Sequence, residues 1–383
     1  MQAVILAAGE GKRLRPLTHT MPKAMVPVAN RPILEHIIRA LEKNGIREII
    51  VVVGYKKEHV IRHLNTLDIP VRVVVQERQL GTAHALACAA PLITGDFLLL
   101  PGDNYVDTAS IARIMREKNA VLTWEHPHPS NFGVLVIRDG LVREVIEKPQ
   151  DAPGFTVSTG IFSLDPSFLQ YLDETEIPDA VNRMIRAGTP LKAVAAADWQ
   201  DAVYPWDLLK LNAALLRDVR PERAGRSGPG VVIRGRVSIG KGTTIGPNTT
   251  ILGPAIIGDD CDIGANCVIT SETSVGARAR VEPFTMIGQS VLLDDVSIGS
   301  HSRIVEAVVG TGSHLGDHAT TFPTKTIFSI EREMIGAKFG AIIGDHICSA
   351  PFCIFRNCIV GNDVVIDDGK TIYGEVPDGA KLL

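Results

Sequence analysis

The feature that most constrains the fold is a six-residue spacing of aliphatic side chains in the second half of the chain. A period of six fits neither an amphipathic helix nor an ordinary hairpin ladder, and eleven consecutive matches exclude chance alternation. It predicts a solenoid of very short parallel strands, in which each aliphatic side chain points to the axis and Gly, Asn or Asp forms a corner. The positions are Ile233, Ile239, Ile245, Ile251, Ile257, Ile263, Ile269, Val275, Val281, Ile287 and Leu293.

This regular spacing changes further along the chain. It slips at Ile298 and Ile304, breaks around 321–335, and partly resumes through Ile343, Val360 and Ile366. The pattern resembles the left-handed parallel β-helix of hexapeptide-repeat proteins, and the left-handedness is implied by that resemblance alone.

The first half of the chain alternates short apolar runs with helical patterns. The runs AVILAA, REIIVVVG, VRVVVQ and DFLLLPGD are typical of buried strands, and helical patterns cover 31–45, 56–66 and 82–90. This alternation predicts a parallel, doubly wound sheet covered on both faces. Ligands of such sheets bind beyond the carboxyl ends of the strands, which is where a glycine-rich loop at 7–24 and the sequence PGDN are expected.

The segment RPERAGRSGPG has the composition of a linker and separates the two halves. We therefore expect a first domain at 1–222, a linker at 223–230 and a repeat domain at 231–383, in agreement with a length of 383 residues that is large for one core.

Composition narrows the class of protein. A net charge of −4 with 21% charged residues is typical of a soluble globular chain and gives no electrostatic reason to expect a nucleic-acid or membrane partner. No apolar run has the length of a membrane-spanning helix, and the N-terminus lacks the basic region of a signal peptide, so we expect a cytoplasmic protein. The six cysteines form no Cys-x-x-Cys pair and are expected to be small, mostly buried side chains.

The loop AAGEGKRLRPLTHTMPKA resembles two known phosphate-binding motifs and fits neither. Leu14 stands where a dinucleotide-binding fingerprint needs its third glycine, and Arg13 stands where a Walker loop needs Ser or Thr. What remains is a glycine turn that can approach a phosphate closely, accompanied by cationic side chains that neutralise its charge.

The same loop, continued to residue 39, closely resembles the signature of sugar-1-phosphate nucleotidylyltransferases, and the resemblance extends over nearly the whole chain. It implies a Rossmann-like, doubly wound mixed sheet followed by the β-helix. It also implies a catalytic set of Arg13, Lys23, Asp103 and Asp201, with both aspartates as magnesium ligands. Nucleotide-binding positions implied in the same way are Leu6, Ala8, Gly9, Gly11, Gln76, Gly81 and Thr82, and sugar-phosphate-binding positions are Gly133, Glu147, Lys148, Thr159 and Gly160.

The chemistry of nucleotidyl transfer agrees with this set. The nucleophile arrives on the substrate, so the enzyme has to align the phosphates and cancel their charge rather than supply a Ser or Cys nucleophile. Mg²⁺ keeps several of its waters and suits two separate aspartates. We expect an in-line attack of a sugar-1-phosphate oxygen on the α-phosphorus of a nucleoside triphosphate, with release of pyrophosphate.

The substrates and the role of the second half are less constrained. The sequence LGTAHA resembles uridylyl-transferring members and the opening signature resembles thymidylyltransferases, which favours UTP or dTTP with a glucose-type or N-acetylglucosamine-type phosphate. The β-helix is expected to assemble the chain as a homotrimer. One alternative is a bifunctional enzyme that also transfers acetyl from acetyl-CoA through His314 or His318, although the usual acetyl-transfer motifs are absent. Another is a non-catalytic subunit, against which the retained catalytic set argues.

Overall fold

The computed structural model describes residues 1–330 and 333–383. The chain forms two compact units. The first consists of Met1–Glu10, Met21–Met25 and Ile33–Asp201, and the second of Gly11–Thr20, Val26–Pro32 and Ala202–Leu383. Two short N-terminal segments therefore belong to the same unit as the C-terminal half of the chain.

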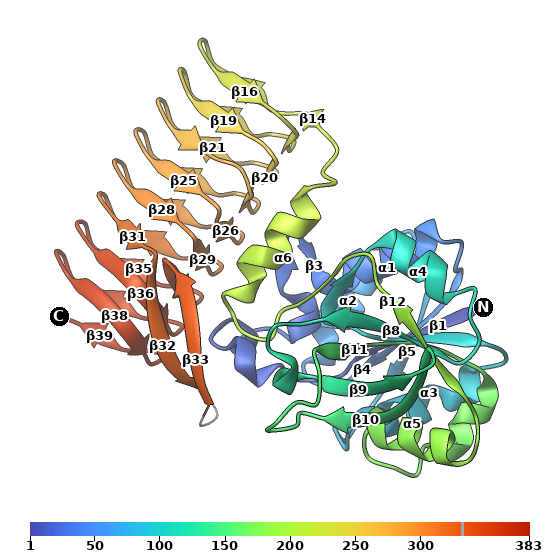
Figure 1. The fold of residues 1–383 in the computed structure, drawn as a ribbon. Helices are drawn as coiled ribbons and strands as arrows, with labels where there is room; N and C mark the ends of the chain where they lie inside the picture. The colour runs from blue at the N-terminus through green and yellow to red at the C-terminus, as the bar shows by residue number, and fades with distance from the viewer. Residues whose placement is uncertain (331–332) are drawn as a thin grey trace. The chain divides into compact units, whose positions relative to one another are not determined.

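The first unit is built on a nine-stranded mixed sheet (Figure 1), which confirms the predicted fold class. Strands β5, β4, β1 and β6 are parallel, β11 joins them antiparallel to β6, and β8, β12, β10 and β9 follow. In chain order the strands are β1 (Gln2–Ala7), β4 (Glu48–Val53), β5 (Val71–Val75), β6 (Phe97–Pro101), β8 (Ala120–Glu125), β9 (Gly133–Arg138), β10 (Leu141–Glu147), β11 (Thr156–Leu164) and β12 (Leu191–Ala195).

Helices cover both faces of this sheet. Helices α3 and α5 contact each other on one face, and α1 and α4 contact each other on the other face (Figure 1). The parallel strands are almost fully buried, because a sheet covered on both sides exposes neither set of alternating side chains. The helices are α1 (Ile33–Lys43), α2 (Lys57–Leu64), α3 (Thr82–Ala89), α4 (Thr108–Ile114) and α5 (Ile177–Arg186).

The second unit contains the predicted parallel β-helix, whose short strands stack in three columns. The first column is β14 (Glu222–Arg223), β17 (Val237–Ile239), β20 (Ala255–Ile257), β23 (Thr273–Val275), β26 (Val291–Leu292), β29 (Ala307–Val309) and β34 (Ala341–Ile343). The second is β15 (Arg226–Ser227), β18 (Thr244–Ile245), β21 (Asp262–Ile263), β24 (Arg280–Val281), β27 (Ser297–Ile298), β30 (His314–Leu315), β35 (Cys348–Ser349), β37 (Val365–Ile366) and β39 (Lys381–Leu382). The third is β16 (Val232–Arg234), β19 (Thr250–Leu252), β22 (Val268–Ile269), β25 (Met286–Gly288), β28 (Arg303–Val305) and β31 (Thr320–Phe322).

The long strand β36 (Ile354–Val360) continues both the first and the third column and pairs with β38 (Thr371–Val376). Residues 223–230, predicted as a linker, differ from that expectation. Arg223 is in β14 and Arg226 begins β15, and these strands pair with β17 and β18, so the segment is already part of the first coil.

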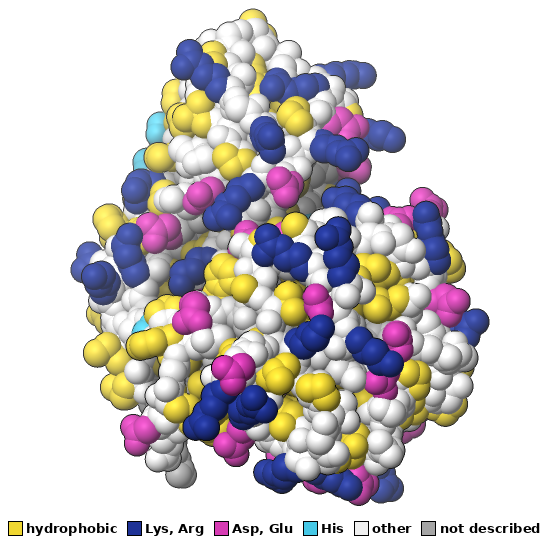
Figure 2. Space-filling view, turned by 45° about the vertical axis from the view of Figure 1, so that its right-hand side comes forward, with side chains coloured by type: hydrophobic (Ala, Val, Ile, Leu, Met, Phe, Trp, Pro, Cys, Tyr) yellow, Lys and Arg dark blue, Asp and Glu magenta, His cyan; other side chains and the backbone are white. Residues whose placement is uncertain are grey.

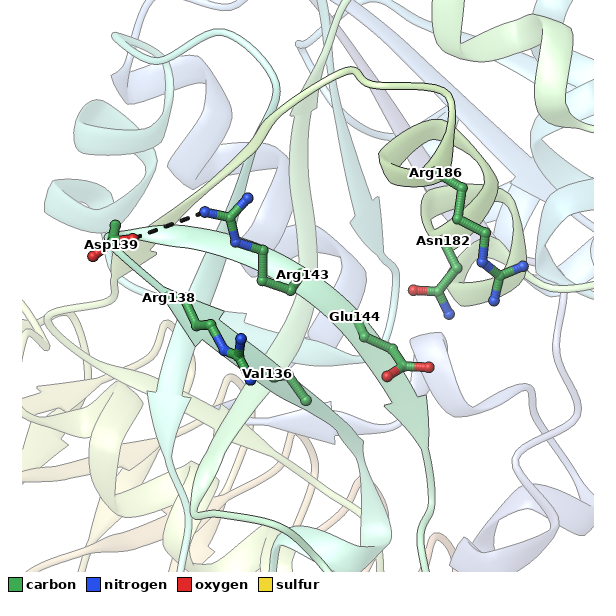
Figure 3. Close-up of a pocket in the computed structure, with 7 residues that line it drawn as sticks. All are labelled: Val136, Arg138, Asp139, Arg143, Glu144, Asn182 and Arg186. Carbon is green, nitrogen blue, oxygen red and sulfur yellow. Dashed lines mark ion pairs between the residues drawn. The ribbon is translucent and has the colours of Figure 1, made fainter.

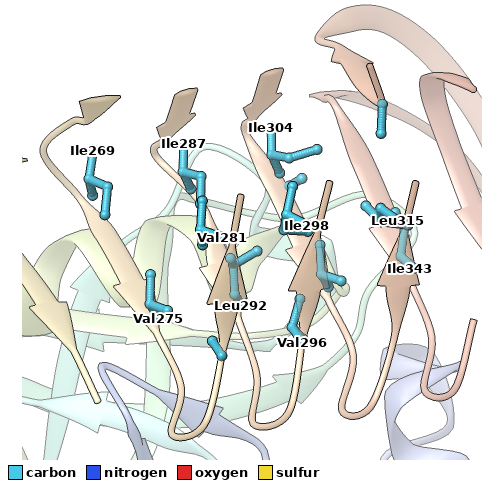
Figure 4. Packing of buried hydrophobic residues seen from close by; sticks show 14 of the residues in the cluster. Ile269, Val275, Val281, Ile287, Leu292, Val296, Ile298, Ile304, Leu315 and Ile343 are labelled. Atoms are coloured by element: carbon cyan, nitrogen blue, oxygen red, sulfur yellow. The ribbon is translucent and has the colours of Figure 1, made fainter. Parts of the chain in front are cut away.

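The aliphatic side chains of successive coils stack in the interior (Figure 4). Early coils have 18 residues, since Ile239 pairs with Ile257, whereas Val275 pairs with Leu292 and that coil has 17. The eleventh predicted position was therefore wrong by one residue: Leu292 takes the stacking position and Leu293 does not. The shorter coil also accounts for the slip at Ile298, because every later interior position is shifted by one.

The break around 321–335 has a physical cause as well. An antiparallel hairpin, β32 (Thr324–Ile330) with β33 (Glu333–Phe339), is inserted into one coil, so that Val309 pairs with Ile343. Beyond the hairpin the 17-residue coil resumes, since Ile343 pairs with Val360.

The second unit also contains helix α6 (Asp207–Leu216) and a small hairpin, β2 (Pro27–Val28) with β3 (Arg31–Pro32). Helix α6 packs on β23, β26 and β29 of the β-helix. Asn212 in this helix accepts a hydrogen bond from the backbone N–H of Ala29 and donates one to the carbonyl of Glu272. The division of the chain in space therefore differs from a division at residue 222.

The surface mixes charges of both signs. On the face shown in Figure 2, Lys and Arg side chains alternate with Asp and Glu, as a net charge of −4 leads one to expect. Within the described part of the chain, the helices all fall short of the length and apolar character needed to cross a membrane.

Candidate active site

A buried lysine between two carboxylates forms the centre of the candidate site. Lys23 Nζ lies 2.8 Å from Asp103 Oδ2 and 3.2 Å from Asp201 Oδ1. The three residues are far apart in the sequence, and the structure brings together three of the four predicted catalytic residues. The fourth, Arg13, belongs to the second unit.

The two aspartates meet because of a small antiparallel ribbon. Strand β7 (Asn104–Val106) pairs with β13 (Trp199–Asp201), and the register places Asp201 opposite Asn104. Asp103 directly precedes β7 and follows the parallel strand β6, so it lies at the carboxyl end of that strand, where ligands of doubly wound sheets bind. Gly102 fixes this position, since a Cβ there would lie 2.8 Å from the Cβ of Ala7.

The electrostatics of Lys23 are set by opposing effects. Burial acts to lower its pKa, but the negative charges and hydrogen bonds of Asp103 and Asp201 outweigh burial and raise the pKa above its usual value. The ammonium is therefore charged throughout the physiological pH range. A fixed positive charge of this kind can bind and orient a phosphate, which a neutral amine could not do.

The same carboxylates fit a magnesium site. Both present hard oxygen ligands at one place, and both are partly accessible, with side-chain exposures of 37% for Asp103 and 20% for Asp201. Among the described residues no group of three or more His, Cys, Asp or Glu side chains could hold a metal ion. Two carboxylates suit Mg²⁺, which usually binds through one or two of them together with water and substrate phosphates.

The predicted phosphate loop is divided between the two units. Leu6, Ala8 and Gly9 belong to the first unit, at the end of β1, where the carbonyl of Leu6 accepts a hydrogen bond from Gly102 N–H. Gly11 begins the segment of the second unit and has φ of +74°, a left-handed conformation that favours glycine. A tight turn then carries Arg13, because Leu14 N–H bonds to the Gly11 carbonyl and Thr18 Oγ1 donates to the same oxygen.

The predicted base-reading residues form a connected group at the start of α3. Gln76 is buried, and its amide nitrogen contacts the carbonyl of Gly81 at 3.0 Å and His84 Nδ1 at 2.9 Å. Gly81 has φ of +108°, and a Cβ there would meet the Thr175 carbonyl. Its substitution would therefore disturb the start of the helix.

Thr82 has a structural task in this group. Its hydroxyl donates to Glu176 Oε2 at 2.7 Å and accepts from Ile177 N–H at 2.9 Å, which joins the start of α3 to the start of α5. The side chain is thus fully hydrogen-bonded within the protein. Its predicted contact with a nucleotide base stays a prediction.

The predicted sugar-phosphate residues come together from three strands. Gly133 in β9 pairs with Glu147 in β10, and a Cβ at Gly133 would lie 3.1 Å from Glu147 Oε2 and 3.9 Å from the Cβ of Ser158 in β11. Lys148 Nζ lies 3.5 Å from Glu147 Oε1, and both side chains are about half exposed. Both therefore have access to a ligand from solvent.

Asn104 connects this group to the aspartates, and sequence reasoning missed it. Its amide nitrogen donates to the carbonyl of Thr159 at 3.1 Å, while Thr159 Oγ1 donates to the Leu122 carbonyl. The Oδ1 atom of Asn104 is buried and has no hydrogen-bond partner in the described structure. The position next to Asp103 in PGDN was the available signal. Gly160 follows with φ of +76° and close to Pro101.

Comparison with known proteins decides the family. A family model described as nucleotidyl transferase matches residues 2–218, which is more than half of the chain. The chain belongs to this family. A second model, described as the GMPPB C-terminal domain, matches residues 251–376 within the β-helix.

Relatives of this nucleotidyltransferase cover its whole length. A bifunctional protein GlmU of Methanococcus maripaludis is 35% identical over 392 residues, 96% of this chain and 95% of the relative. The low-salt glycan biosynthesis nucleotidyltransferase Agl11 of Haloferax volcanii is 34% identical and aligns with 82% of this chain and 94% of its own. The UTP–glucose-1-phosphate uridylyltransferase AglF of the same organism is 37% identical over 54% of this chain and 93% of its own.

Among solved structures, a putative glucose-1-phosphate thymidylyltransferase from Bacillus anthracis is similar with a TM-score of 0.52 and 27% identity, covering 58% of this chain and 98% of the other. These relatives confirm the resemblance to sugar-1-phosphate nucleotidylyltransferases that the opening loop indicated.

A hollow elsewhere on the nucleotidyltransferase unit does not contain the predicted site. It has a volume of about 740 Å³ and lies among side chains of β9, β10 and α5 (Figure 3). Its charged lining includes an ion pair of Arg143 with Asp139 at 4.0 Å. Because none of the predicted site residues lines it, the chemistry is assigned to the cluster around Lys23. The lining residues are Val136, Arg138, Asp139, Arg143, Glu144, Asn182 and Arg186.

The two histidines considered for acetyl transfer lie on the outside of the β-helix. His314 is exposed in β30 and pairs with Cys348. His318 forms part of a column of stacked rings, between His301 at 5.2 Å and Phe352 at 4.7 Å. Both flat faces of the His318 ring are thus covered by neighbouring rings.

Proposed function

We propose that this chain catalyses transfer of a uridylyl or thymidylyl group from UTP or dTTP to a glucose-type or N-acetylglucosamine-type 1-phosphate, with release of pyrophosphate. The observation that carries the proposal is the buried Lys23 with Asp103 and Asp201 at the carboxyl end of the central strand β6. Such an arrangement supplies charge for phosphates and provides no nucleophile of its own, as expected when the attacking oxygen is on the substrate.

The residues take distinct roles in this mechanism. The turn at Gly9 and Gly11 lets the backbone approach the triphosphate, and Arg13 and Lys23 neutralise the charge that develops at the α-phosphorus and on the leaving pyrophosphate. Glu147 and Lys148, beside Gly133, bind the sugar phosphate, with Thr159 and Gly160 forming the wall of that subsite. Gln76 and Gly81 face the base, where the fixed orientation of the Gln76 amide selects one hydrogen-bonding edge.

Magnesium would be held by Asp103 and Asp201. It supplies Lewis-acid stabilisation of the negative charge on the phosphates. The accessible carboxylate oxygens support this proposal, and Lys23 keeps the pair ionised before metal and nucleotide bind.

The preference for a pyrimidine nucleotide and a glucose-type sugar is supported by the names of relatives. One acts on UTP and glucose-1-phosphate, and a structural neighbour is named as a glucose-1-phosphate thymidylyltransferase. We further propose that the enzyme works in the cytoplasm as a trimer formed by its β-helix. Exposed apolar side chains on the outer surface of the coils, among them Leu252, Val268 and Phe322, support association there.

The decisive experiment measures pyrophosphate release with the four ribonucleoside triphosphates and dTTP, each against the 1-phosphates of glucose, N-acetylglucosamine and mannose. The expected result is Mg²⁺-dependent release that is highest for UTP or dTTP with a glucose-type or N-acetylglucosamine-type phosphate. Fastest turnover with GTP and mannose-1-phosphate would contradict the proposed substrates.

A second candidate activity, acetyl transfer from acetyl-CoA to glucosamine-1-phosphate, is favoured by one observation: a relative that matches 96% of this chain is named a bifunctional protein. Exposed His314 would be the base in this reaction, since the ring of His318 is covered on both faces. The test is acetyl transfer by the full chain, which should be abolished in His314→Ala. Absence of acetyl transfer in the unmodified chain would exclude this candidate.

A further inference from the structure

Acidic and amide side chains form a ladder along one corner of the β-helix. At each rung, the side-chain Oδ1 of one coil accepts a backbone N–H of the preceding coil. The rungs are Asp259 to Lys241, Asp294 to Ala277, Asp345 to Thr311, Asn362 to Asp345 and Asp378 to Asn362, at distances of 2.7 to 2.9 Å. The ladder satisfies corner N–H groups that the strand pairing leaves without a partner.

The last three rungs use their second side-chain atom differently from the first two. Asp345 Oδ2 accepts from Thr20 Oγ1 at 2.6 Å, and Asn362 Nδ2 donates to the carbonyl of Pro16 at 3.2 Å. Asp378 Oδ2 lies 2.7 Å from His19 Nδ1. Three consecutive rungs thus bind three nearby positions of the segment that carries Arg13, and all of these residues belong to the second unit.

Two of these contacts are buried, which makes their loss costly. Asp345 is 2% exposed and Asn362 is 4% exposed. If the bond to Thr20 or to Pro16 were missing, a buried carboxylate oxygen or amide would lose a partner that water cannot readily replace. The segment is therefore held at a defined position relative to the last coils.

The segment itself transmits this position to Arg13. Leu14, Leu17 and Thr18 are almost completely buried, and the turn is closed by the bonds from Leu14 N–H and Thr18 Oγ1 to Gly11. A hollow of about 710 Å³ is lined jointly by Arg13 and by side chains of the last coils, including Glu375 and Asp378. A shift of residues 16–20 would therefore move the guanidinium of Arg13 as well.

We propose that Asp345, Asn362 and Asp378 are positioning residues for nucleotidyl transfer, which hold the phosphate loop through Thr20, Pro16 and His19 and so place Arg13. This inference rests on the proposed function, because it assigns Arg13 to the stabilisation of the reacting phosphates. The β-helix then has a part in the chemistry of the chain in addition to any part in assembly.

Two substitutions in the full chain separate positioning from folding. Thr20→Val removes the hydroxyl that donates to Asp345 and keeps the shape of the side chain. Asn362→Asp keeps an Oδ1 acceptor for the ladder but faces the Pro16 carbonyl with an oxygen instead of an N–H. The matched control is Thr244→Val, since Thr244 Oγ1 donates to Asp262 Oδ1 at 2.9 Å in β-helix strands that do not contact the loop.

The first readout is steady-state pyrophosphate release. Each loop variant should lower kcat about tenfold, the scale of one hydrogen bond, with a smaller change in the KM for the nucleotide. Thr244→Val should retain wild-type turnover. The substitutions are then repeated in an Arg13→Ala background, where they should cause no further loss, because positioning has nothing left to act on.

The second readout is amide hydrogen exchange of the peptide covering residues 11–20, which does not depend on activity. Faster exchange in both loop variants and unchanged exchange in Thr244→Val are expected. Unchanged exchange, wild-type kcat, an equal loss in the Arg13→Ala background, or an equal loss in Thr244→Val would each overturn the proposal. If the unmodified chain releases no pyrophosphate with any substrate, the proposed function fails and the positioning role falls with it, while the exchange data still decide whether the ladder holds the loop.

Discussion

The two units use side chains of the same types in different ways. In the nucleotidyltransferase unit, Lys23, Asp103 and Asp201 come from three distant parts of the sequence and make contacts that occur once. In the β-helix, the Asp and Asn corner residues and the interior Ile and Val residues recur in coil after coil. Loss of a unique contact should affect chemistry, whereas loss of a repeated contact should affect stability. The exceptions are repeated residues that also make a unique contact.

The largest effect is expected at the unique cluster. Lys23→Ala should lower the turnover of pyrophosphate release by about 100- to 1,000-fold, the range for loss of one electrostatic stabiliser of a transition state. Lys192→Ala is the control, because Lys192 pairs with Glu117 at the surface and is 53% exposed. Turnover of Lys23→Ala within a factor of three of the control would mean that the cluster is only an ion pair.

Charge neutralisation at one aspartate should act in the same direction. Asp103→Asn should reduce turnover and raise the Mg²⁺ concentration needed for half-maximal activity by about tenfold, since removing one ligand charge from the pair weakens binding. It should also lower the pKa of Lys23, because Asp103 is the foremost of the groups that raise it. An unchanged Mg²⁺ requirement would exclude Asp103 as a ligand.

A repeated position in the β-helix should give the opposite result. Ile287 is fully buried in the stacked interior, so Ile287→Ala should reduce the free energy of unfolding by about 2–5 kcal/mol, measured by urea denaturation. Turnover of the folded fraction should stay unchanged. Val268→Ala, at a side chain that is 36% exposed, should cost less than about 0.5 kcal/mol. Equal losses for the two variants would argue against the stacked core.

The smallest effect concerns coil length. Inserting one alanine after Gln289 restores 18 residues at a corner, and we expect a cost of about 1 kcal/mol or less, because lengthening a corner changes its closure entropy little. An insertion between Arg280 and Val281 is the contrast, since it turns Val281 out of the interior and should be far more destabilising in the same denaturation experiment. Equal costs would show that corners tolerate length changes no better than strands.

Thiol reactivity offers a further comparison within the β-helix. Cys348 is exposed and should react with a thiol reagent at pH 8 well before the buried Cys261, Cys267, Cys353 and Cys358. Burial raises the pKa of Cys358 to about 12. Since the unfolded thiol ionises at about 8.5, this group should leave stability unchanged below that pH and reduce it progressively from about pH 8.5 to 12. Rapid reaction of all thiols in the native chain would contradict this picture.

The sequence predicted the β-helix because its interior positions repeat, and periodicity is a local property that can be counted. It predicted the position of Leu293 incorrectly, since both Leu292 and Leu293 are aliphatic and only the pairing with Val275 distinguishes them. The inserted hairpin was visible only as a break, because its own alternation is too short to identify a partner.

The candidate site was predictable where a long motif carried it. The opening loop and its resemblance identified Lys23, Asp103 and Asp201, and the structure places them in contact. The task of Asn104 could not be inferred, because its contact with Thr159 depends on the packing of two strands. Nor could the contacts of Asp345 or Asp378, which in the sequence are identical to every other corner aspartate of the repeat.

The hydrogen bonds between residues 16–20 and the last coils also have a consequence for synthesis of the chain. Translation produces the phosphate loop first and Asp378, close to the final residue Leu383, almost last. A nascent or prematurely released chain can therefore contain the complete motif at 7–24 and both aspartates and still lack the groups that hold the loop. The arrangement links the competence of the enzyme to completion of its polypeptide, so that incomplete chains do not consume nucleotide.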